Sequence, residues 1–225
     1  MKVFYLILFL FGLNSGSAQL QTITNQTEYP FWINVPETEK TEKQPILIFL
    51  HGKSLSGTDL NRVRRYGVLR AMDKGRKIPA IVVAPQLAKG SWNPDKVLEV
   101  LEYVKKNYNL DESQIYVCGM SLGGYGTLHF AGKHADKITA AVAICGGGNT
   151  SDGCTLSTIP IWIQHGDKDY IVPISESQKV VNAIRKCNEK AKLIFTMIKG
   201  GNHGSVENIF HQDAMYNWLF EQKRE

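Results

Sequence analysis

Short apolar runs alternate along this chain with longer segments in which apolar residues recur every three or four positions. Several of the runs are apolar nearly throughout, as in parallel strands that are covered on both faces. The runs cover residues 31–35, 46–50, 80–84, 115–118, 139–144, 159–164 and 193–198. The segments with a helical period cover residues 60–72, 95–108, 122–134, 176–187 and 206–222. This alternation predicts an α/β fold with a mostly parallel sheet.

The N-terminal segment has a different pattern from the rest of the chain. Lys2 is followed by an apolar run over residues 3–13 and then by the small residues Gly16, Ser17 and Ala18. This order is typical of a secretory signal peptide, and the run is shorter than the roughly 20 residues of a membrane-spanning helix. An N-terminal membrane anchor is the alternative interpretation. We expect cleavage after Ala18, a single domain over residues 19–225, and a secreted or periplasmic protein with no stable membrane insertion after cleavage.

Composition and charge fit an ordinary folded protein. The chain has 225 residues, of which 43% are hydrophobic and 21% are charged, so one domain can bury most of its apolar surface. The net charge of +5 is spread over the sequence, and apolar residues interrupt the densest basic stretch, residues 62–70. No stripe of Lys and Arg runs beside stacking aromatic residues, so we expect no nucleic-acid partner.

The four cysteines enter an oxidising compartment if the leader directs export. Their spacing fits no zinc motif, and we expect no metal site. Cys118 ends an apolar run and is expected to be a buried free thiol. Cys145 and Cys154 flank a glycine-rich loop and could pair with each other. Cys187 lies farther along, and the sequence leaves the connectivity open.

The strongest chemical signal is the segment Gly-Met-Ser-Leu-Gly at residues 119–123. It follows the predicted strand 115–118 and opens the predicted helix 122–134. A serine at a sharp strand-to-helix turn needs small neighbours two residues away on either side, because the helix packs closely there. The turn lifts the hydroxyl above the sheet, and the helix N-terminus favours a developing negative charge. We therefore predict that Ser121 is a nucleophile, and not part of a merely structural turn.

A serine hydroxyl needs a base to take its proton. Of the six histidines, His203 lies in a glycine-rich loop between the predicted strand 193–198 and the last helix. A histidine in that position can reach the carboxyl edge of the sheet, so we predict that His203 is the base. The remaining histidines fall in helices or directly before a glycine at a strand end, and we expect structural roles for them: His51, His129, His134, His165 and His211.

A carboxylate that holds the imidazole would complete the arrangement. Asp167 and Asp169 both follow the predicted strand 159–164, and either could instead stabilise a turn through its own backbone. The order Ser, Asp, His is that of α/β-hydrolases. Spacing alone leaves the choice between the two carboxylates open.

Three segments, residues 119–126, 144–148 and 165–173, give the chain a family resemblance. It resembles the small, lidless α/β-hydrolase esterases described as phospholipase/carboxylesterase-like or prolyl-oligopeptidase-like, whose relatives include feruloyl esterases and polyhydroxybutyrate depolymerases. The resemblance extends from about residue 31 to residue 219. It implies that the acid is the Asp three residues after His-Gly, which is Asp169. It also implies that Trp92 could line the substrate pocket, the alternative being an aromatic that packs under its loop.

Two backbone donors are expected for the oxyanion of the transition state. One is the N–H of Leu122, directly after the nucleophile, and the other comes from the loop at residues 51–57. Lys53 is the preferred second donor and Ser54 the alternative. The Lys53 side chain either lies in solvent or meets an anionic part of the substrate.

The segment from residue 145 to residue 158 is short, polar and rich in glycine, with no amphipathic pattern for a lid. An open site favours short or exposed acyl esters, either in small molecules or linked to polysaccharides. We therefore expect a secreted serine esterase that acts through an acyl-enzyme and needs no metal or organic cofactor. A serine peptidase of the prolyl-oligopeptidase-like type is the nearest alternative, and a catalytically inactive binding protein is the third.

Overall fold

The computed structural model describes residues 20–37 and 42–224, and the expected signal peptide lies outside them. The strands are β1 Leu20–Ile23, β2 Phe31–Asn34, β3 Gln44–Leu50, β4 Ile81–Pro85, β5 Leu110–Met120, β6 Ala140–Ile144, β7 Ile161–Gly166 and β8 Leu193–Ile198. They form one eight-stranded sheet in the order β1-β2-β4-β3-β5-β6-β7-β8. The pairs β1–β2 and β2–β4 are antiparallel, and all other neighbouring pairs are parallel.

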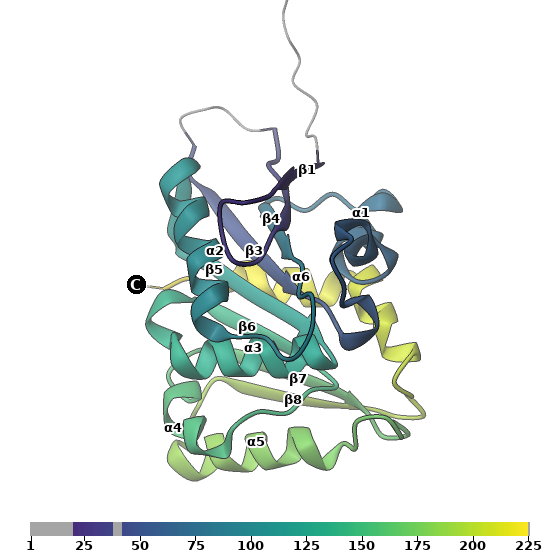
Figure 1. Cartoon of the computed structure of the whole chain (residues 1–225). Helices are drawn as coiled ribbons and strands as arrows, with labels where there is room; N and C mark the ends of the chain where they lie inside the picture. The colour runs from purple at the N-terminus through teal and green to yellow at the C-terminus, as the bar shows by residue number, and fades with distance from the viewer. Residues whose placement is uncertain (1–19, 38–41, 225) are drawn as a thin grey trace, which may run out of the picture.

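Helices pack on both faces of this sheet (Figure 1). They are α1 Val68–Asp73, α2 Pro94–Asn107, α3 Leu122–Lys133, α4 Gly153–Leu156, α5 Ser175–Cys187 and α6 Asp213–Glu221. Short 3₁₀ helices lie between them: η1 Lys53–Leu55, η2 Leu60–Arg65, η3 Ala135–Lys137, η4 Thr150–Asp152 and η5 Ser205–His211. None of the helices in the described part of the chain is long and apolar enough to cross a membrane.

The core consists of two layers, one on each face of the sheet. Helices α2, α3 and α5 bury their apolar side chains against one face, and α1, η5 and α6 cover the other. Strands β4 and β6 are buried at every position, because each of their side chains faces one of these two layers. Full burial of an aliphatic side chain contributes about 2 kcal/mol, so the central strands stabilise the fold strongly. Burial on both faces explains why these strands are continuous apolar runs in the sequence and do not alternate with polar residues.

Two predicted helices are interrupted in the structure. The segment 60–72 divides into η2 and α1 at Gly67, whose φ is +77°. The positive φ is not helical, and a Cβ at Gly67 would lie 2.2 Å from the Phe49 ring, so only glycine fits at this break. The segment 206–222 divides into η5 and α6. Strand β1 is half polar, and the sequence pattern did not predict it.

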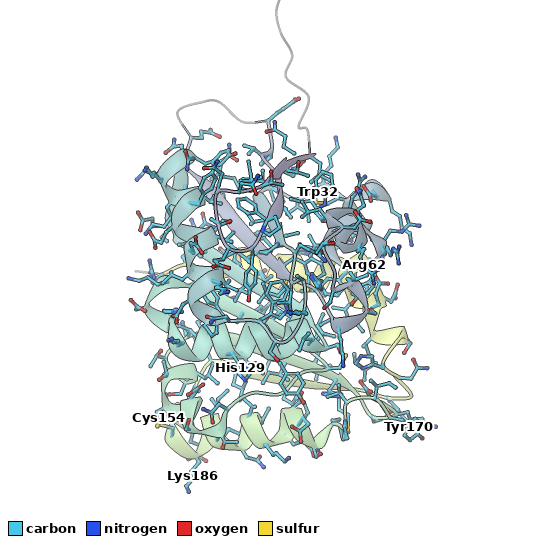
Figure 2. The ribbon with its side chains drawn as sticks, viewed as in Figure 1. Trp32, Arg62, His129, Cys154, Tyr170 and Lys186 are labelled. Atoms are coloured by element: carbon cyan, nitrogen blue, oxygen red, sulfur yellow. A yellow bond between two sulfur atoms is a disulfide. The ribbon has the colours of Figure 1, made fainter. Side chains whose placement is uncertain are left out.

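The disulfide differs from the pairing considered for Cys145 and Cys154. Cys154 on α4 is bonded to Cys187 at the end of α5, with the two Cα atoms 5.1 Å apart. Cys118 and Cys145 are buried free thiols. Cys145 directly follows β6 and is fully buried, whereas Cys154 lies at the surface (Figure 2), so the two positions face different surroundings. The pairing of Cys145 with Cys154 is therefore wrong, and the free buried thiol expected at Cys118 is confirmed.

Candidate active site

The residues expected to carry the chemistry all follow strands at the carboxyl edge of the parallel sheet. Lys53 follows β3, Ser121 follows β5, Asp169 follows β7 and His203 follows β8. Because parallel strands end at the same edge, segments that are far apart in the sequence meet there.

Ser121 lies at a sharp turn between β5 and α3, with a φ of +59° that L residues rarely adopt. The turn requires glycine on both sides. A Cβ at Gly123 would lie 1.8 Å from the carbonyl oxygen of Leu50, and one at Gly119 would lie 2.3 Å from the carbonyl oxygen of Gly123. The close approach of α3 to the sheet thus fixes the serine at the rim.

Ser121, His203 and Asp169 form one hydrogen-bonded chain. Nε2 of His203 lies 2.9 Å from Oγ of Ser121, and Nδ1 lies 2.7 Å from Oδ2 of Asp169. A carboxylate can only accept, so Nδ1–H donates to Asp169 and the lone pair of Nε2 accepts the serine O–H. The structure brings the three expected residues together in the order that proton transfer from the hydroxyl requires.

The carboxylate of Asp169 is buried and held by its own loop. Its Oδ1 accepts the N–H groups of Ile171 and Val172, each at 2.9 Å. Burial acts to raise the pKa of Asp169, but hydrogen bonds from Val172, His203 and Ile171 outweigh it and lower the pKa below its ordinary value. The group therefore stays ionised beside the imidazole at neutral pH.

Asp167, the rival carboxylate, has a different partner. Its Oδ1 accepts the N–H of Gly200 at 2.7 Å, and its side chain is exposed. It links the loops that follow β7 and β8. Asp169, not Asp167, lies against His203.

A second histidine lies behind the acid. The buried His165 has its Nε2 2.9 Å from the carbonyl oxygen of Val172 and 3.5 Å from Oδ2 of Asp169. Its Nδ1 is 2.7 Å from Oγ of Ser177, which donates to the carbonyl oxygen of Gly146. Burial is the largest influence on His165 and lowers its pKa, against opposing contributions from Val172 and Asp169. His165 therefore joins the acid loop to α5 and to the glycine-rich loop after β6.

Both expected oxyanion donors are the first residues of helices. Leu122 begins α3 and Lys53 begins η1. The first N–H groups of a helix have no acceptor within it, so they are free for a ligand. A Cβ at Gly52 would lie 3.4 Å from Cβ of Ser121, which shows that the loop carrying Lys53 borders the serine.

Tyr66 and Glu207 belong to this region and were missed by the sequence analysis. The Tyr66 hydroxyl accepts the N–H of Gly52 at 3.1 Å and the Ser54 hydroxyl at 3.3 Å. Oε1 of Glu207 accepts the N–H of Gly67 at 2.9 Å. Tyr66 lies within the basic stretch of residues 62–70, which the sequence analysis considered only for its charge. The break at Gly67 is the one local signal that could have separated it from that stretch.

A cavity of about 360 Å³ opens directly over the serine. It is lined by Lys53, Ser54, Tyr66, Met120, Ser121, Ile171, His203, Gly204 and Glu207. Ile171 is 72% exposed and its neighbour Tyr170, which projects from the edge of the molecule in Figure 2, is 87% exposed. The cavity is therefore small, open to solvent, and bordered by an exposed apolar loop.

Trp92 does not reach this cavity. It is 4% exposed, and its Nε1 donates to the carbonyl oxygen of His51 at 3.0 Å. A Cβ at Gly126 would lie 2.6 Å from its ring, so Trp92 packs directly on α3. His51 donates from Nδ1 to the carbonyl oxygen of Gly52 at 2.8 Å and accepts the N–H of Leu87 at 3.0 Å. The pair braces the loop that carries Lys53.

One compact group of potential metal ligands occurs among the described residues. Sγ of Cys145, a carboxylate oxygen of Asp169 and a ring nitrogen of His203 lie within 4.8 Å of one another. Two ligands of one tetrahedral zinc ion, each bonded at about 2.0 Å, lie about 3.3 Å apart. The 2.7 Å between Nδ1 of His203 and Oδ2 of Asp169 is instead a hydrogen bond.

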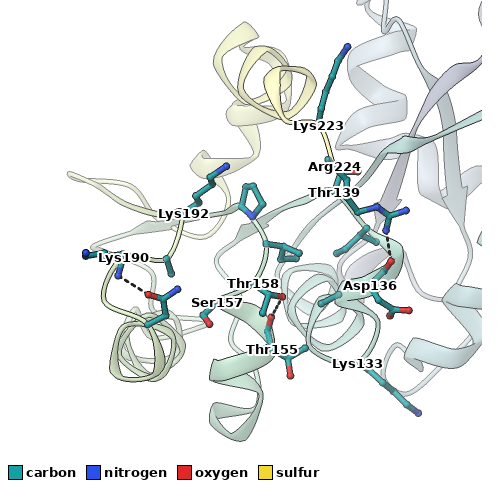
Figure 3. A pocket seen from close by; sticks show the side chains of 16 residues that line it. Lys133, Asp136, Thr139, Thr155, Ser157, Thr158, Lys190, Lys192, Lys223 and Arg224 are labelled. Atoms are coloured by element: carbon teal, nitrogen blue, oxygen red, sulfur yellow. Dashed lines mark hydrogen bonds between the residues drawn. The ribbon is translucent and has the colours of Figure 1, made fainter.

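A larger cavity, of about 900 Å³, lies at the opposite edge of the sheet (Figure 3). Several lysines border it, and Arg224 donates to the backbone oxygen of Asp136 there. None of its lining residues is a histidine or a cysteine. The smaller cavity contains both Ser121 and His203, so it is the candidate active site.

The sheet and the hydrogen-bonded Ser, His and Asp at its carboxyl edge define an α/β-hydrolase, which confirms the fold class expected from the sequence. A family model described as phospholipase/carboxylesterase matches residues 93–216, which is more than half of the chain. The protein belongs to the phospholipase/carboxylesterase family.

Related proteins agree with this family. A probable feruloyl esterase C from Aspergillus terreus is 28% identical over 185 residues, which are 75% of this chain and 67% of that protein. A bifunctional acetylxylan esterase/xylanase from Neocallimastix patriciarum is 33% identical over 85 residues, which are 37% of this chain and 12% of that protein. The crystal structure of a thermostable esterase superposes with a TM-score of 0.79 at 30% identity, covering 92% of this chain and 64% of that one. The chain thus spans only part of each of these proteins.

Proposed function

We propose that this protein is a serine esterase that cleaves carboxylic esters, with Ser121 as nucleophile, His203 as general base and Asp169 as the orienting acid. The observation that carries this proposal is the hydrogen-bonded chain from the Ser121 hydroxyl through His203 to Asp169. Membership of the phospholipase/carboxylesterase family supports the choice of ester chemistry.

In the first half of the reaction, His203 removes the hydroxyl proton as Oγ of Ser121 attacks the ester carbonyl carbon. The buried Asp169 stabilises the imidazolium that forms. The N–H groups of Leu122 and Lys53 bind the oxyanion, and one such donor contributes about 3–4 kcal/mol to transition-state stabilisation. His203 then gives its proton to the leaving alcohol, and the acyl group stays on Ser121.

In the second half, water replaces the alcohol. His203 takes a proton from the water as it attacks the acyl-enzyme carbonyl, and the same two N–H groups bind the second oxyanion. Protonation of Oγ releases the carboxylic acid and restores Ser121. Each step uses only groups of the chain and water.

The substrates are short or exposed acyl esters, in small molecules or on polysaccharides. A cavity of about 360 Å³ is near the lower limit for ligand sites and suits a small acyl group better than a long lipid chain. Between β6 and β7 the described chain forms only the short η4 and α4, which are too small for a lid. The names of the two curated relatives, which refer to acetylxylan and feruloyl esters, support the same substrate class.

The protein acts outside the cytoplasm. The leader-like pattern of residues 1–18 supports export, and the disulfide between Cys154 and Cys187 fits an oxidising compartment.

A substrate panel tests the proposal against its nearest alternative, a serine peptidase. Purified protein is assayed with p-nitrophenyl esters of increasing acyl length and with dipeptidyl p-nitroanilides. We expect ester turnover that declines with acyl length, and a loss of several orders of magnitude in kcat for Ser121→Ala with unchanged thermal unfolding. Amide cleavage without comparable ester turnover would establish the peptidase instead.

A further inference from the structure

Glu207 is an acidic side chain in the wall of the cavity over Ser121, and the proposed reaction does not use it. Its Oε1 accepts the N–H of Gly67 at 2.9 Å and lies 3.2 Å from Nε2 of His211. Oε2 accepts no hydrogen bond from the described residues, yet it is not one of their buried atoms without a partner. This second oxygen is therefore accessible to solvent and free to bind a ligand.

Bracing the chain at Gly67 explains only part of this side chain. The N–H of Gly67 needs one acceptor, which the neutral amide of a glutamine would also supply. The carboxylate of Glu207 adds a negative charge to the cavity in which the oxyanion forms, and this charge by itself disfavours the transition state. The free, charged oxygen therefore indicates a binding role in addition to the brace.

Glu207 and the base His203 come from the same segment of the chain. Glu207 belongs to η5, which begins two residues after His203, and its N–H donates to the carbonyl oxygen of Gly204 at 3.3 Å. In the proposed mechanism His203 protonates the leaving alcohol, so the alcohol oxygen must come within hydrogen-bond reach of its ring. We therefore expect the alcohol part of an ester, and not the acyl group, to pass the carboxylate.

The neighbours of Glu207 in the cavity are polar and come from the segment after β3. Tyr66 directly precedes Gly67, and its hydroxyl lies 3.3 Å from Oγ of Ser54. Lys53 lines the same cavity, so a positively charged alcohol would meet another cation there. A neutral hydroxyl meets no such repulsion, and it can both donate to the carboxylate and accept from these neighbours.

We propose that Glu207 is a specificity-determining residue, whose free carboxylate oxygen accepts a hydrogen bond from a hydroxyl group on the alcohol part of the substrate. The preferred substrates are then esters of polyhydroxy alcohols, and this inference rests on the proposed esterase mechanism. A hydroxyl of the alcohol donates to Oε2, while its other oxygens can accept from Lys53 or Tyr66. A simple alkyl alcohol has no such donor and leaves the carboxylate without a partner, which weakens binding.

Glu207→Gln separates this binding role from the structural brace. Its amide oxygen can still accept the N–H of Gly67, so the NH₂ group takes the place of the free oxygen and donates where the carboxylate accepts. Glu189→Gln removes the same charge from an exposed position before β8, at the opposite edge of the sheet, and is the matched control. Thermal unfolding and fluorophosphonate labelling of Ser121 establish that each variant is folded and reactive.

Two acetate esters differ in the donors that they present. Glycerol 1-acetate carries two hydroxyl groups, whereas 2,3-dimethoxypropyl acetate carries two methoxy groups, which accept hydrogen bonds but cannot donate them. The kcat/KM for each ester is measured by titration of the released acetic acid. The ratio of the two values is compared between proteins, so that the intrinsic reactivity of the esters cancels. Acetylcholine, a cationic ester without a donor, shows whether charge alone is recognised.

We expect the wild type to prefer glycerol 1-acetate, and Glu207→Gln to lower the ratio by about tenfold, as for the loss of one hydrogen bond to a charged acceptor. Glu189→Gln should keep the wild-type ratio. An unchanged ratio in Glu207→Gln, or a loss of kcat/KM confined to acetylcholine, would overturn this inference while leaving the esterase activity intact. A wild type that labels at Ser121 but hydrolyses none of the three esters would contradict the proposed function and, with it, the role of Glu207.

Discussion

At the scale of single residues, the site depends on which groups can donate and which can only accept. The carboxylate of Asp169 fixes Nδ1–H of His203, and this leaves Nε2 free to take the serine proton. Asp167 lies only two residues away, but its carboxylate accepts the N–H of Gly200 instead. Two chemically identical side chains in one loop therefore have different roles, because one is buried against the imidazole and the other is exposed.

Substitution of these two carboxylates tests the assignment of the acid. In Asp169→Asn the side-chain NH₂ can donate to Nδ1 of His203. The imidazole proton then lies on Nε2, which can no longer accept the serine proton, so kcat for p-nitrophenyl acetate should fall by about four orders of magnitude. Asp167→Asn keeps an acceptor for the N–H of Gly200 and should change kcat by less than about threefold. Equal losses in the two variants would mean that the acid has been assigned wrongly.

His51 gives a prediction for the pH dependence of stability. Burial lowers its pKa from 6.5 to about 4, a contact with the Gly52 carbonyl opposes the shift, and Arg62 adds to it. The unfolded chain thus binds the proton before the folded one does. The stability from neutral His51 is fully present above about pH 6.5 and declines as the pH falls from there toward 4, by about 3 kcal/mol in all.

Urea unfolding at intervals between pH 7 and pH 4 measures this effect. The wild type should lose stability more steeply over this range than His51→Asn, which has no group to titrate there. The variant should also be less stable at pH 7, because the N–H of Leu87 loses its acceptor. Parallel curves for the two proteins would show that His51 does not carry the predicted shift.

At the scale of elements, the pattern of apolar residues predicted the strands well and the helices less well. Strands β2 to β8 were predicted from their apolar runs. In β4 and β6 burial on both faces is the cause of the run, whereas the edge strand β8 is apolar in sequence although none of its residues is buried. A glycine at position 67 is a local signal for a break, but the close approach of the Phe49 ring, which leaves no room for a side chain there, involves a distant strand and could not be predicted. Glu207, which accepts the N–H of Gly67 and lines the same cavity as Tyr66, comes from a distant segment and had no signal in the sequence as part of the site.

The disulfide also required the packing of elements that are distant in sequence. Cys154 on α4 meets Cys187 at the end of α5 across a separation of 33 residues. Closing a loop of this length in the unfolded chain contributes about 3–4 kcal/mol to stability. Cys154→Ser should therefore lower the free energy of unfolding by a few kcal/mol, measured by urea denaturation, while kcat is retained because the bridge lies outside the site. Equal stability of the variant and the wild type would show that the bridge does not form in solution.

At the scale of the whole molecule, the parallel sheet places four chain segments at one edge. The order Ser, Asp, His in the sequence predicted that a serine, a carboxylate and a histidine meet at this edge, because the carboxyl ends of parallel strands lie together. The choice of Asp169 over Asp167 came from the family resemblance. The sequence could not predict the volume of the cavity or the exposure of Tyr170 and Ile171, which depend on how the loops pack. Access to the site from solvent is the property that separates this molecule from lidded lipases of the same fold.

The central claim is that the hydroxyl of Ser121 forms a covalent acyl-enzyme during ester cleavage. The most direct measurement is rapid mixing with excess p-nitrophenyl acetate, acid quenching, and mass spectrometry of the intact protein and of its peptides. The account predicts one acetyl group per chain on the peptide that contains Ser121, and no such adduct in Ser121→Ala. Ester turnover with no adduct on this peptide, or undiminished turnover by Ser121→Ala, would contradict it.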